Sequence, residues 1–151
     1  MERKVKENKI LEKVLGRIRK DKMNYMEDNR IKEDMLNIMK TRNFFNVKKI
    51  RDNIEETKRR IDELTSIESR INSVTKDEYD IIKNPIEEVE QDLNKRKSVL
   101  TKEIGNLIDM KKLLDENTDK EMIDEIEKMK IERLRNKSII IDLIDILCEN
   151  K

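Results

Sequence analysis

The chain has 151 residues, of which 46% are charged and 35% are hydrophobic, and its formal net charge is only +1. Globular proteins typically have about 25% charged residues, so this chain is too polar to fill a thick globular core. It lacks tryptophan and has only two glycines and one proline, which argues against loop-rich and sandwich folds. Thin seams between long helices need only two or three apolar positions in seven, and the composition can supply these.

The first helix is predicted over residues 5–42, with one apolar face near its start and another near its end. The first 22 residues carry nine Lys or Arg against four Asp or Glu. This basic excess has two interpretations. It is either a solvated face beside an acidic neighbour in the same bundle, or a contact for an acidic partner or a nucleic acid.

A turn is expected around residues 41–46, followed by a second helix over residues 46–74. Asn43 or Asn46 could cap this helix by accepting from its free amides. The only two phenylalanines, Phe44 and Phe45, are adjacent here and cannot both lie on one narrow seam. Either one of them plugs the end of the bundle and the other is half exposed, or the pair is a binding hot spot for a partner.

The third helix is predicted over residues 76–116, with a capping box from Thr75 to Glu78 at its start. Pro85 falls ten residues after Thr75, where a proline would kink a continuous helix. The alternative is a second start at Asn84, with Pro85 as the first helical residue and Glu87 as the third. We favour the kinked helix, because the apolar pattern keeps its phase across Pro85.

That apolar pattern is the strongest signal in the sequence. Alternating steps of three and four residues trace one side of a helix, and nine of the eleven positions are apolar. The track must press against another helix, in this chain or in a partner. Its members are Tyr79, Ile82, Ile86, Val89, Leu93, Arg96, Leu100, Glu103, Leu107, Met110 and Leu114.

A fourth helix is predicted over residues 119–149, opened by a capping box from Thr118 to Glu121. Seven of the nine residues from Ile139 to Leu147 are apolar, which is the most hydrophobic run in the chain. This run is either buried on most sides or exposed as a docking patch for another subunit.

Most catalytic chemistry is absent from the sequence, so we predict no enzyme and no cofactor. The chain has no histidine, which removes catalytic triads and histidine metal sites. Residues 115–126 resemble a calcium loop, but Lys120 replaces its glycine and Ile126 its bidentate glutamate. The single Cys148 fits a reducing compartment, and no apolar run is long enough for a membrane span. We therefore expect a cytoplasmic or nuclear protein without a small-molecule substrate or membrane contact.

The charge pattern argues against direct nucleic-acid binding. The chain lacks aromatic platforms, and no strongly basic stripe follows the N-terminal segment. Residues 1–75 carry 20 basic and 14 acidic residues, whereas residues 76–151 carry 15 and 20. The halves therefore have net charges of +6 and −5, which suits self-association better than DNA binding.

Residues 9–25 resemble the opening helix of the tubulin-binding cofactor A family, whose Arg-Leu-x-Lys-Glu-x-x-x-Tyr pattern would fall on Arg17, Ile18, Lys20, Asp21 and Tyr25. The family's second signature is similar to the segment from Phe45 to Lys49. The resemblance implies a small three-helix bundle that holds β-tubulin without catalysis. Residues 72–101 look about as similar to the coiled coil of meiotic homologous-pairing proteins, and residues 50–82 to the helical part of a family of splicing factors.

The sequence thus predicts an all-α fold, an elongated antiparallel helical bundle or coiled coil of about four helices, in one domain over residues 1–151. The leading functional hypothesis is a non-catalytic protein-binding protein, with a tubulin-chaperone-like cofactor as its specific form. The alternative is an obligate coiled-coil subunit of a larger nuclear complex in splicing, recombination or chromosome organisation. The expected partner is tubulin, another protein or a second copy. The candidate partner-binding residues are Arg17, Lys20, Tyr25, Phe44, Phe45, Lys48, Lys49, Ile140, Ile144 and Leu147.

Overall fold

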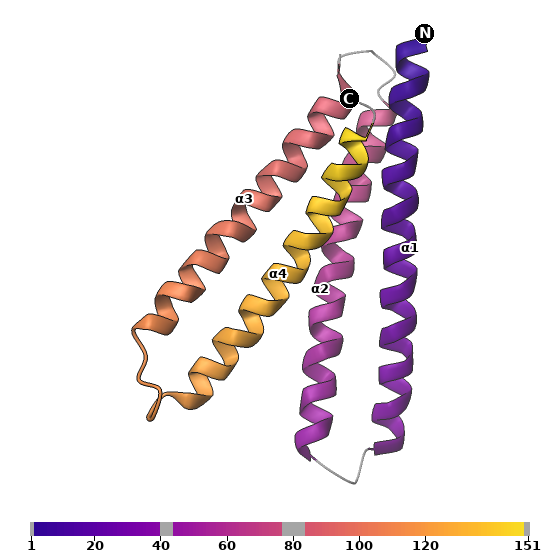
Figure 1. Cartoon of the computed structure of the whole chain (residues 1–151). Coiled ribbons are helices and arrows are strands. Elements are labelled where there is room, and N and C mark those ends of the chain that lie inside the picture. The colour runs from indigo at the N-terminus through magenta and orange to yellow at the C-terminus, as the bar shows by residue number, and fades with distance from the viewer. Residues whose placement is uncertain (1, 40–43, 77–83, 150–151) are drawn as a thin grey trace. The chain divides into compact units, whose positions relative to one another are not determined.

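The computed structural model describes the backbone of residues 2–39, 44–76 and 84–149, and the side chains of residues 8–38, 47–76 and 84–149. These residues form helices without strands, which confirms the predicted all-α fold (Figure 1). The helices are α1 (Glu2–Met39), α2 (Phe44–Thr75), α3 (Pro85–Lys112) and α4 (Lys120–Cys148).

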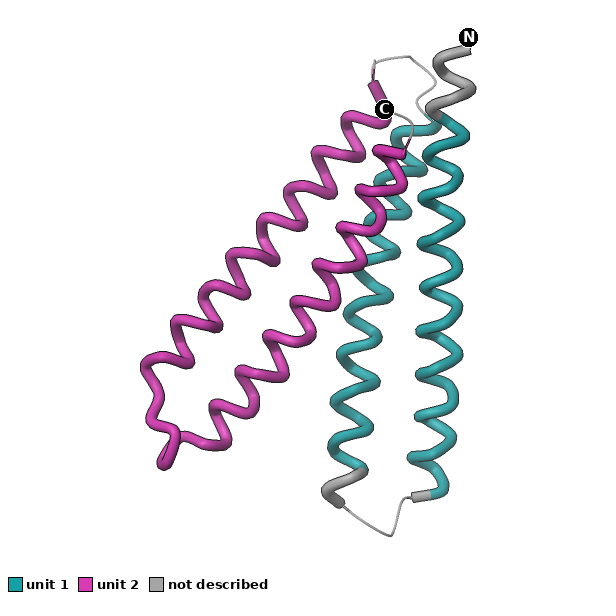
Figure 2. The backbone as a smooth tube through the Cα atoms, in the orientation of Figure 1, with its two compact units in different colours: residues 1–83 teal, residues 84–151 magenta. Residues whose placement is uncertain are grey.

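The chain divides into two compact units, where the sequence predicts one helical domain (Figure 2). Residues 1–83 form the first unit, in which α1 packs against α2. Residues 84–151 form the second, in which α3 packs against α4. Each unit is therefore a helical hairpin that closes a seam of its own.

The α1–α2 hairpin is antiparallel, as its cross-helix contacts show. Lys22 Nζ lies 3.4 Å from Glu68 Oε1, and the guanidinium carbon of Arg60 lies 5.0 Å from the ring centroid of Tyr25. As the residue number rises along α1, the number of the residue that it contacts on α2 falls. In this register, the start of α1 lies beside the end of α2, and both segments bury apolar side chains. These are Leu11, Val14, Leu15 and Ile18 on α1, and Leu64, Ile67, Ile71 and Val74 on α2.

The α3–α4 hairpin repeats this arrangement. Lys111 Nζ lies 2.7 Å from Glu127 Oε1, and Arg133 Nε donates to Glu103 Oε2 at 2.6 Å, which fixes an antiparallel register. The buried apolar side chains cluster toward the two ends of the hairpin, with charged residues between them. They are Val89, Leu93, Ile104 and Leu107 on α3, and Ile126, Ile140, Leu143 and Leu147 on α4.

The predicted seam of α3 is right at three buried positions, is displaced by one residue at Glu103, and is wrong at Met110, which is 50% exposed. Val89, Leu93 and Leu107 are buried as the three-four pattern requires. Beyond Leu100, however, Ile104 is buried in place of Glu103, whose carboxylate accepts from Arg133 at the rim. The reason is that a straight helix of 3.6 residues per turn drifts against a strict seven-residue repeat. The predicted positions Tyr79 and Ile82 lie outside the described residues.

The prediction of one kinked helix running through Pro85 is wrong, because α3 begins at Pro85. Asn84 is the N-cap residue: its Oδ1 accepts from the Glu87 N–H at 3.3 Å, and its Nδ2 donates to Glu87 Oε2 at 3.0 Å. A proline at the first helical position loses no hydrogen bond, and its fixed φ suits a helix start. The proline therefore stabilises a helix start at the position where we predicted a kink.

Two predicted helix caps, Thr75 and Thr118, are also wrong, and one of the two candidates for a third is excluded. Thr75 is the last residue of α2, and its hydroxyl donates to the Asn72 carbonyl at 3.1 Å. Asn46, one of the two candidate caps of the second helix, lies inside α2, since this helix begins at Phe44, and the other candidate, Asn43, lies outside the described residues. Asp119 replaces Thr118 as the N-cap residue of α4, and its Oδ2 accepts from the Asp115 N–H at 3.0 Å within the connecting turn. Hydroxyl and amide side chains can serve a turn or a helix interior as well as a cap, so their spacing alone misplaced these starts.

Two leucines of the second hairpin test the seam directly. Leu93 is 0% exposed, whereas Leu113, at the end of α3, is 86% exposed. Removing a buried leucine side chain leaves a cavity, so Leu93→Ala should lower the free energy of unfolding by about 2–5 kcal/mol. Leu113→Ala should change it by less than about 0.5 kcal/mol. Urea denaturation followed by circular dichroism measures both values, and equal effects would contradict the assignment of the seam.

The Asn84 cap makes a second prediction. Asn84→Ala removes the acceptor for the Glu87 amide, so the free energy of unfolding should fall by about 1 kcal/mol. Asn94→Ala is the matched control, since Asn94 is exposed within α3, where alanine is the better helix former. A loss at Asn94 as large as that at Asn84 would show that the cap is not the cause.

Candidate protein-binding faces

The middle of the α1–α2 seam is polar where a typical coiled coil would be apolar. Along α1 the seam continues from Ile18 through Lys22, Tyr25, Asn29 and Lys32, in steps of three and four residues. Asn29 is buried, and its Nδ2 donates to the Ile54 carbonyl at 3.4 Å. Its Oδ1 is buried and accepts no hydrogen bond from the described residues. A buried polar atom without a partner costs stability, so this half of the hairpin is held less tightly than the apolar half.

Tyr25, a predicted partner-binding residue, belongs to this polar seam. Its side chain is half-buried, and the guanidinium of the buried Arg60 lies over its ring. A cation over an aromatic face is attracted by the ring's negative charge density. The structure therefore gives Tyr25 a contact that holds α1 to α2.

The side of α1 turned away from α2 carries a continuous row of exposed side chains, which we call the α1 outer face. Its residues follow one another in steps of three or four, so they share one side of the helix. The first three are basic, and the last three are large and apolar. The α1 outer face consists of Lys13, Arg17, Lys20, Asn24, Glu27, Ile31, Met35 and Ile38.

The apolar end of the α1 outer face was missed by the sequence interpretation. Ile31, Met35 and Ile38 are exposed, and Ile38 is 80% exposed. The apolar face predicted near the end of this helix does not separate its two adjacent sides, because sequence hydrophobicity alone does not say which of them packs. The sequence does carry a signal for the α1 outer face. Its residues keep a spacing of three and four, and they change from basic ones to apolar ones along the helix.

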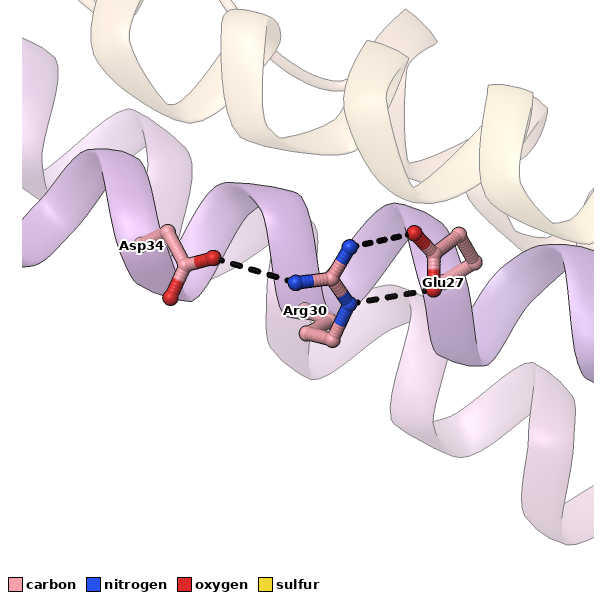
Figure 3. Close-up of polar contacts among 3 residues, drawn as sticks. All are labelled: Glu27, Arg30 and Asp34. Carbon is pink, nitrogen blue, oxygen red and sulfur yellow. Dashed lines mark hydrogen bonds and ion pairs between the residues drawn. The ribbon is translucent and has the colours of Figure 1, made fainter.

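Ion pairs within α1 join Glu27 of the α1 outer face to its neighbour Arg30, and Arg30 to Asp34. Arg30 Nη2 lies 2.5 Å from Glu27 Oε1, and Arg30 Nη1 lies 3.3 Å from Asp34 Oδ2 (Figure 3). The hydrogen bond from Arg30 lowers the pKa of the Glu27 carboxyl below its usual value, and the same contact raises the pKa of Arg30. Each of these side chains is exposed, so the pairs organise charge on the surface and contribute little to the fold.

The remaining predicted residues of the first hairpin do not form one patch. Arg17 and Lys20 are exposed on the α1 outer face, where Arg17 Nε lies 3.1 Å from Asp21 Oδ2. Lys48 and Lys49 are exposed near the start of α2, which the antiparallel register places beside the end of α1. Twenty residues of helix separate that end from Arg17, or about 30 Å at 1.5 Å per residue. The side chains of Phe44 and Phe45 lie outside the described residues.

The predicted residues of α4 lie on the side of the helix that faces α3. Ile140 and Leu147 are each 1% exposed, and Ile144 is partly buried. Of the two interpretations of this apolar run, the structure supports burial. Cys148, which follows Leu147, is a free thiol with a partly buried side chain.

A second exposed row runs along α4, and the sequence interpretation missed it. Ile131, Leu134 and Ile141 are between 37% and 46% exposed. With the exposed Ser138 and Asp145 they follow a three-four spacing on the side of α4 away from α3. We call these five residues the α4 outer stripe.

Three further features concern ligand, metal and membrane binding. An open hollow of about 320 Å³ lies beside the first turns of α3, but all its lining residues come from α3 and its N-cap, including Glu87 and Glu90. Small-molecule sites are usually enclosed and largely apolar, so we assign no ligand to it. Within the described ranges, no group of three or more Cys, Asp or Glu side chains is placed to hold a metal ion. No described helix is long and apolar enough to cross a membrane.

Comparisons with known proteins add no relatives to this picture. Searches of protein-family models, of curated proteins and of solved structures each found no match to the chain. The resemblance of residues 9–25 to the tubulin-binding cofactor A family therefore stays a prediction. The exposed faces of the helices are the basis on which function has to be proposed.

The buried Asn29 gives a prediction that separates stability from surface chemistry. Asn29→Leu replaces a poorly satisfied amide with an apolar side chain, so the free energy of unfolding should rise by about 1–3 kcal/mol. Asn24→Leu, on the exposed side of the same helix, is the matched control and should change it little. If Asn29→Leu lowered the free energy of unfolding, the hydrogen bond to Ile54 would outweigh the unpaired oxygen.

Proposed function

We propose that this chain is a non-catalytic protein-binding protein, and that its partner contacts the α1 outer face. The observation that carries the proposal is the ordered change along that face from basic residues to exposed apolar ones. The hairpin seam uses the opposite side of α1, so binding needs no unfolding of the hairpin.

The chemistry of the α1 outer face selects one kind of partner. Lys13, Arg17 and Lys20 attract an acidic surface, while Ile31, Met35 and Ile38 gain free energy when an apolar groove covers them. The face spans 25 residue steps of helix, or about 38 Å. A matching partner presents an acidic patch next to an apolar groove, aligned along one helix. Two separated contacts of different chemistry also fix the direction in which the helix lies.

The specific form we propose to test first is a tubulin-chaperone-like cofactor. Its support is the resemblance of residues 9–25, because Arg17 and Lys20 of that segment lie on the α1 outer face. Tyr25 is a poor probe of binding, since its contact with Arg60 ties it to the hairpin. Exposed residues are better probes, because their substitution leaves the seam intact.

The alternative is an obligate subunit of a larger nuclear assembly. That hypothesis needs a partner to cover the apolar end of α4. The burial of Ile140 and Leu147 in the second hairpin favours the self-contained form, since a partner would have to displace α3 to reach them.

Two sets of variants test the α1 outer face, with purified tubulin as the first probe and affinity capture from cell extract as the second. Ile31→Gln combined with Met35→Gln and Ile38→Gln removes the apolar contact, and Lys13→Glu with Lys20→Glu reverses the basic one. We expect each set to weaken binding about tenfold or more, since several interface residues change together. The charge set should also reduce the salt dependence of binding.

The matched control changes exposed apolar residues elsewhere, Val99→Gln with Met110→Gln on α3. It should bind as the unaltered chain does, and all variants should keep their helicity because the changed residues are exposed. Binding that survives both α1 sets would contradict the proposed face. A third outcome separates the face from the partner. The unaltered chain then captures a protein other than tubulin from the extract, and the α1 variants no longer capture it. In that case the face is right and tubulin is the wrong partner.

A further inference from the structure

We propose that the α1–α2 hairpin unfolds locally at one end while its other end stays folded. The opening half comprises residues 25–38 of α1 and 47–60 of α2, and the closed half comprises residues 11–22 and 64–75. The antiparallel register pairs the two segments of each half with one another. Such an opening needs no partner, so the inference does not depend on the proposed function.

The two halves bury very different amounts of apolar surface. In the closed half, eight apolar side chains are buried, and each is at most 6% exposed. Among the described side chains of the opening half, Ile54 is the one buried apolar residue. Four others are only partly buried, namely Tyr25, Leu36, Val47 and Ile50. Burial of apolar surface is the main favourable term in folding, so the closed half holds most of the free energy that keeps the hairpin together.

Polar contacts join the two helices in the opening half. Asn29 Nδ2 donates to the Ile54 carbonyl at 3.4 Å, and Lys32 Nζ donates to Asn53 Oδ1. Water replaces such hydrogen bonds when the half opens, so their net contribution to stability is small. The buried Asn29 Oδ1 accepts no hydrogen bond from the described residues, and opening lets it accept one from water. Opening this half therefore costs far less free energy than opening the closed half.

Ion pairs within α1 do not offset this difference. Arg30 contacts Glu27 and Asp34 in the opening half, but the three side chains are each more than half exposed (Figure 3). Exposed pairs of this kind contribute little to stability.

Opening here means unfolding of the helices, because two intact helices cannot swing apart at this end. α2 begins at Phe44, five residues after α1 ends at Met39, so the chain itself ties the two helices together. Contiguous segments with few buried apolar contacts unfold as units, at a lower free energy than the whole protein. The opening half has this character, and the closed half does not.

The division has a consequence for the α1 outer face. Its basic residues, from Lys13 to Lys20, lie in the closed half, whereas its apolar residues, from Ile31 to Ile38, lie in the opening half. A partner that covers the apolar end stabilises the folded form of the opening half, because binding to one form shifts the equilibrium toward it. This consequence rests on the proposed function, whereas the opening is tested on the chain alone.

Native-state hydrogen exchange on the full chain tests the opening, since the protection factor of an amide reports the free energy of the unfolding event that exposes it. Amides of the opening half should have protection factors about tenfold or more below those of the closed half. Low concentrations of urea should lower the protection factors of the closed half alone, because the opening half exposes little apolar surface when it unfolds. Equal protection factors in the two halves would overturn the proposal.

Two matched isoleucine variants show whether the opening is local. Ile18→Val removes one buried methyl group from the closed half, and Ile54→Val removes one from the opening half. Each change should lower the affected protection factors about 2- to 10-fold. Ile18→Val should affect the closed half alone, because Ile18 stays packed when the other half opens. Ile54→Val should affect both halves, because Ile54 loses its packing in local and in complete unfolding.

A hairpin that unfolds in a single step gives a different pattern. Both variants would then lower the protection factors of both halves equally, and this result would refute the local opening. Circular dichroism of each variant reports whether its helices are intact, and the small size of the change from isoleucine to valine favours a folded chain.

Discussion

Each unit of this protein depends on one constraint, the burial of a narrow apolar strip between two antiparallel helices. A chain with 46% charged residues cannot surround a helix with apolar neighbours, so each helix buries one side only. In the first hairpin the buried strip runs from Leu11 to Ile18 against Leu64 to Val74, and in the second Leu93 and Leu143 are both 0% exposed. Because so little of each helix is buried, its opposite side is available for other proteins.

Both hairpins place polar residues in the middle of the strip. The first has the buried Asn29, with Tyr25 beneath Arg60, and the second has Arg133 donating to Glu103 at 2.6 Å. Polar groups in a seam lower stability, but they allow only registers in which they find each other. Without these polar groups, one helix could shift by seven residues along the other at a modest cost in free energy, because the apolar residues are evenly spaced. The polar middle thus fixes which residues reach the outer faces and in what order.

The helical class could be predicted from the sequence because three-four spacing and scarce glycine and proline leave few other folds. The helix starts could not, since Pro85 fits either a kink or a first turn, and only the paired contacts of Asn84 and Glu87 decide between them. The burial of Ile140 within the chain could not be predicted either, because an apolar run has the same sequence pattern whether its own chain or a partner covers it. The outer faces were missed for a related reason: a helix can carry two tracks, and hydrophobicity favours only the stronger one.

The central claim is that each hairpin closes its own seam, and helicity measured over a wide dilution series tests it most directly. Circular dichroism should show the same helical content at every concentration, even where light scattering shows that any dimer has dissociated to the 18.2 kDa chain. Contacts within one chain do not depend on concentration, whereas contacts with a partner do. Helicity that falls on dilution together with the molar mass would contradict the claim, because the seams would then belong to an assembly.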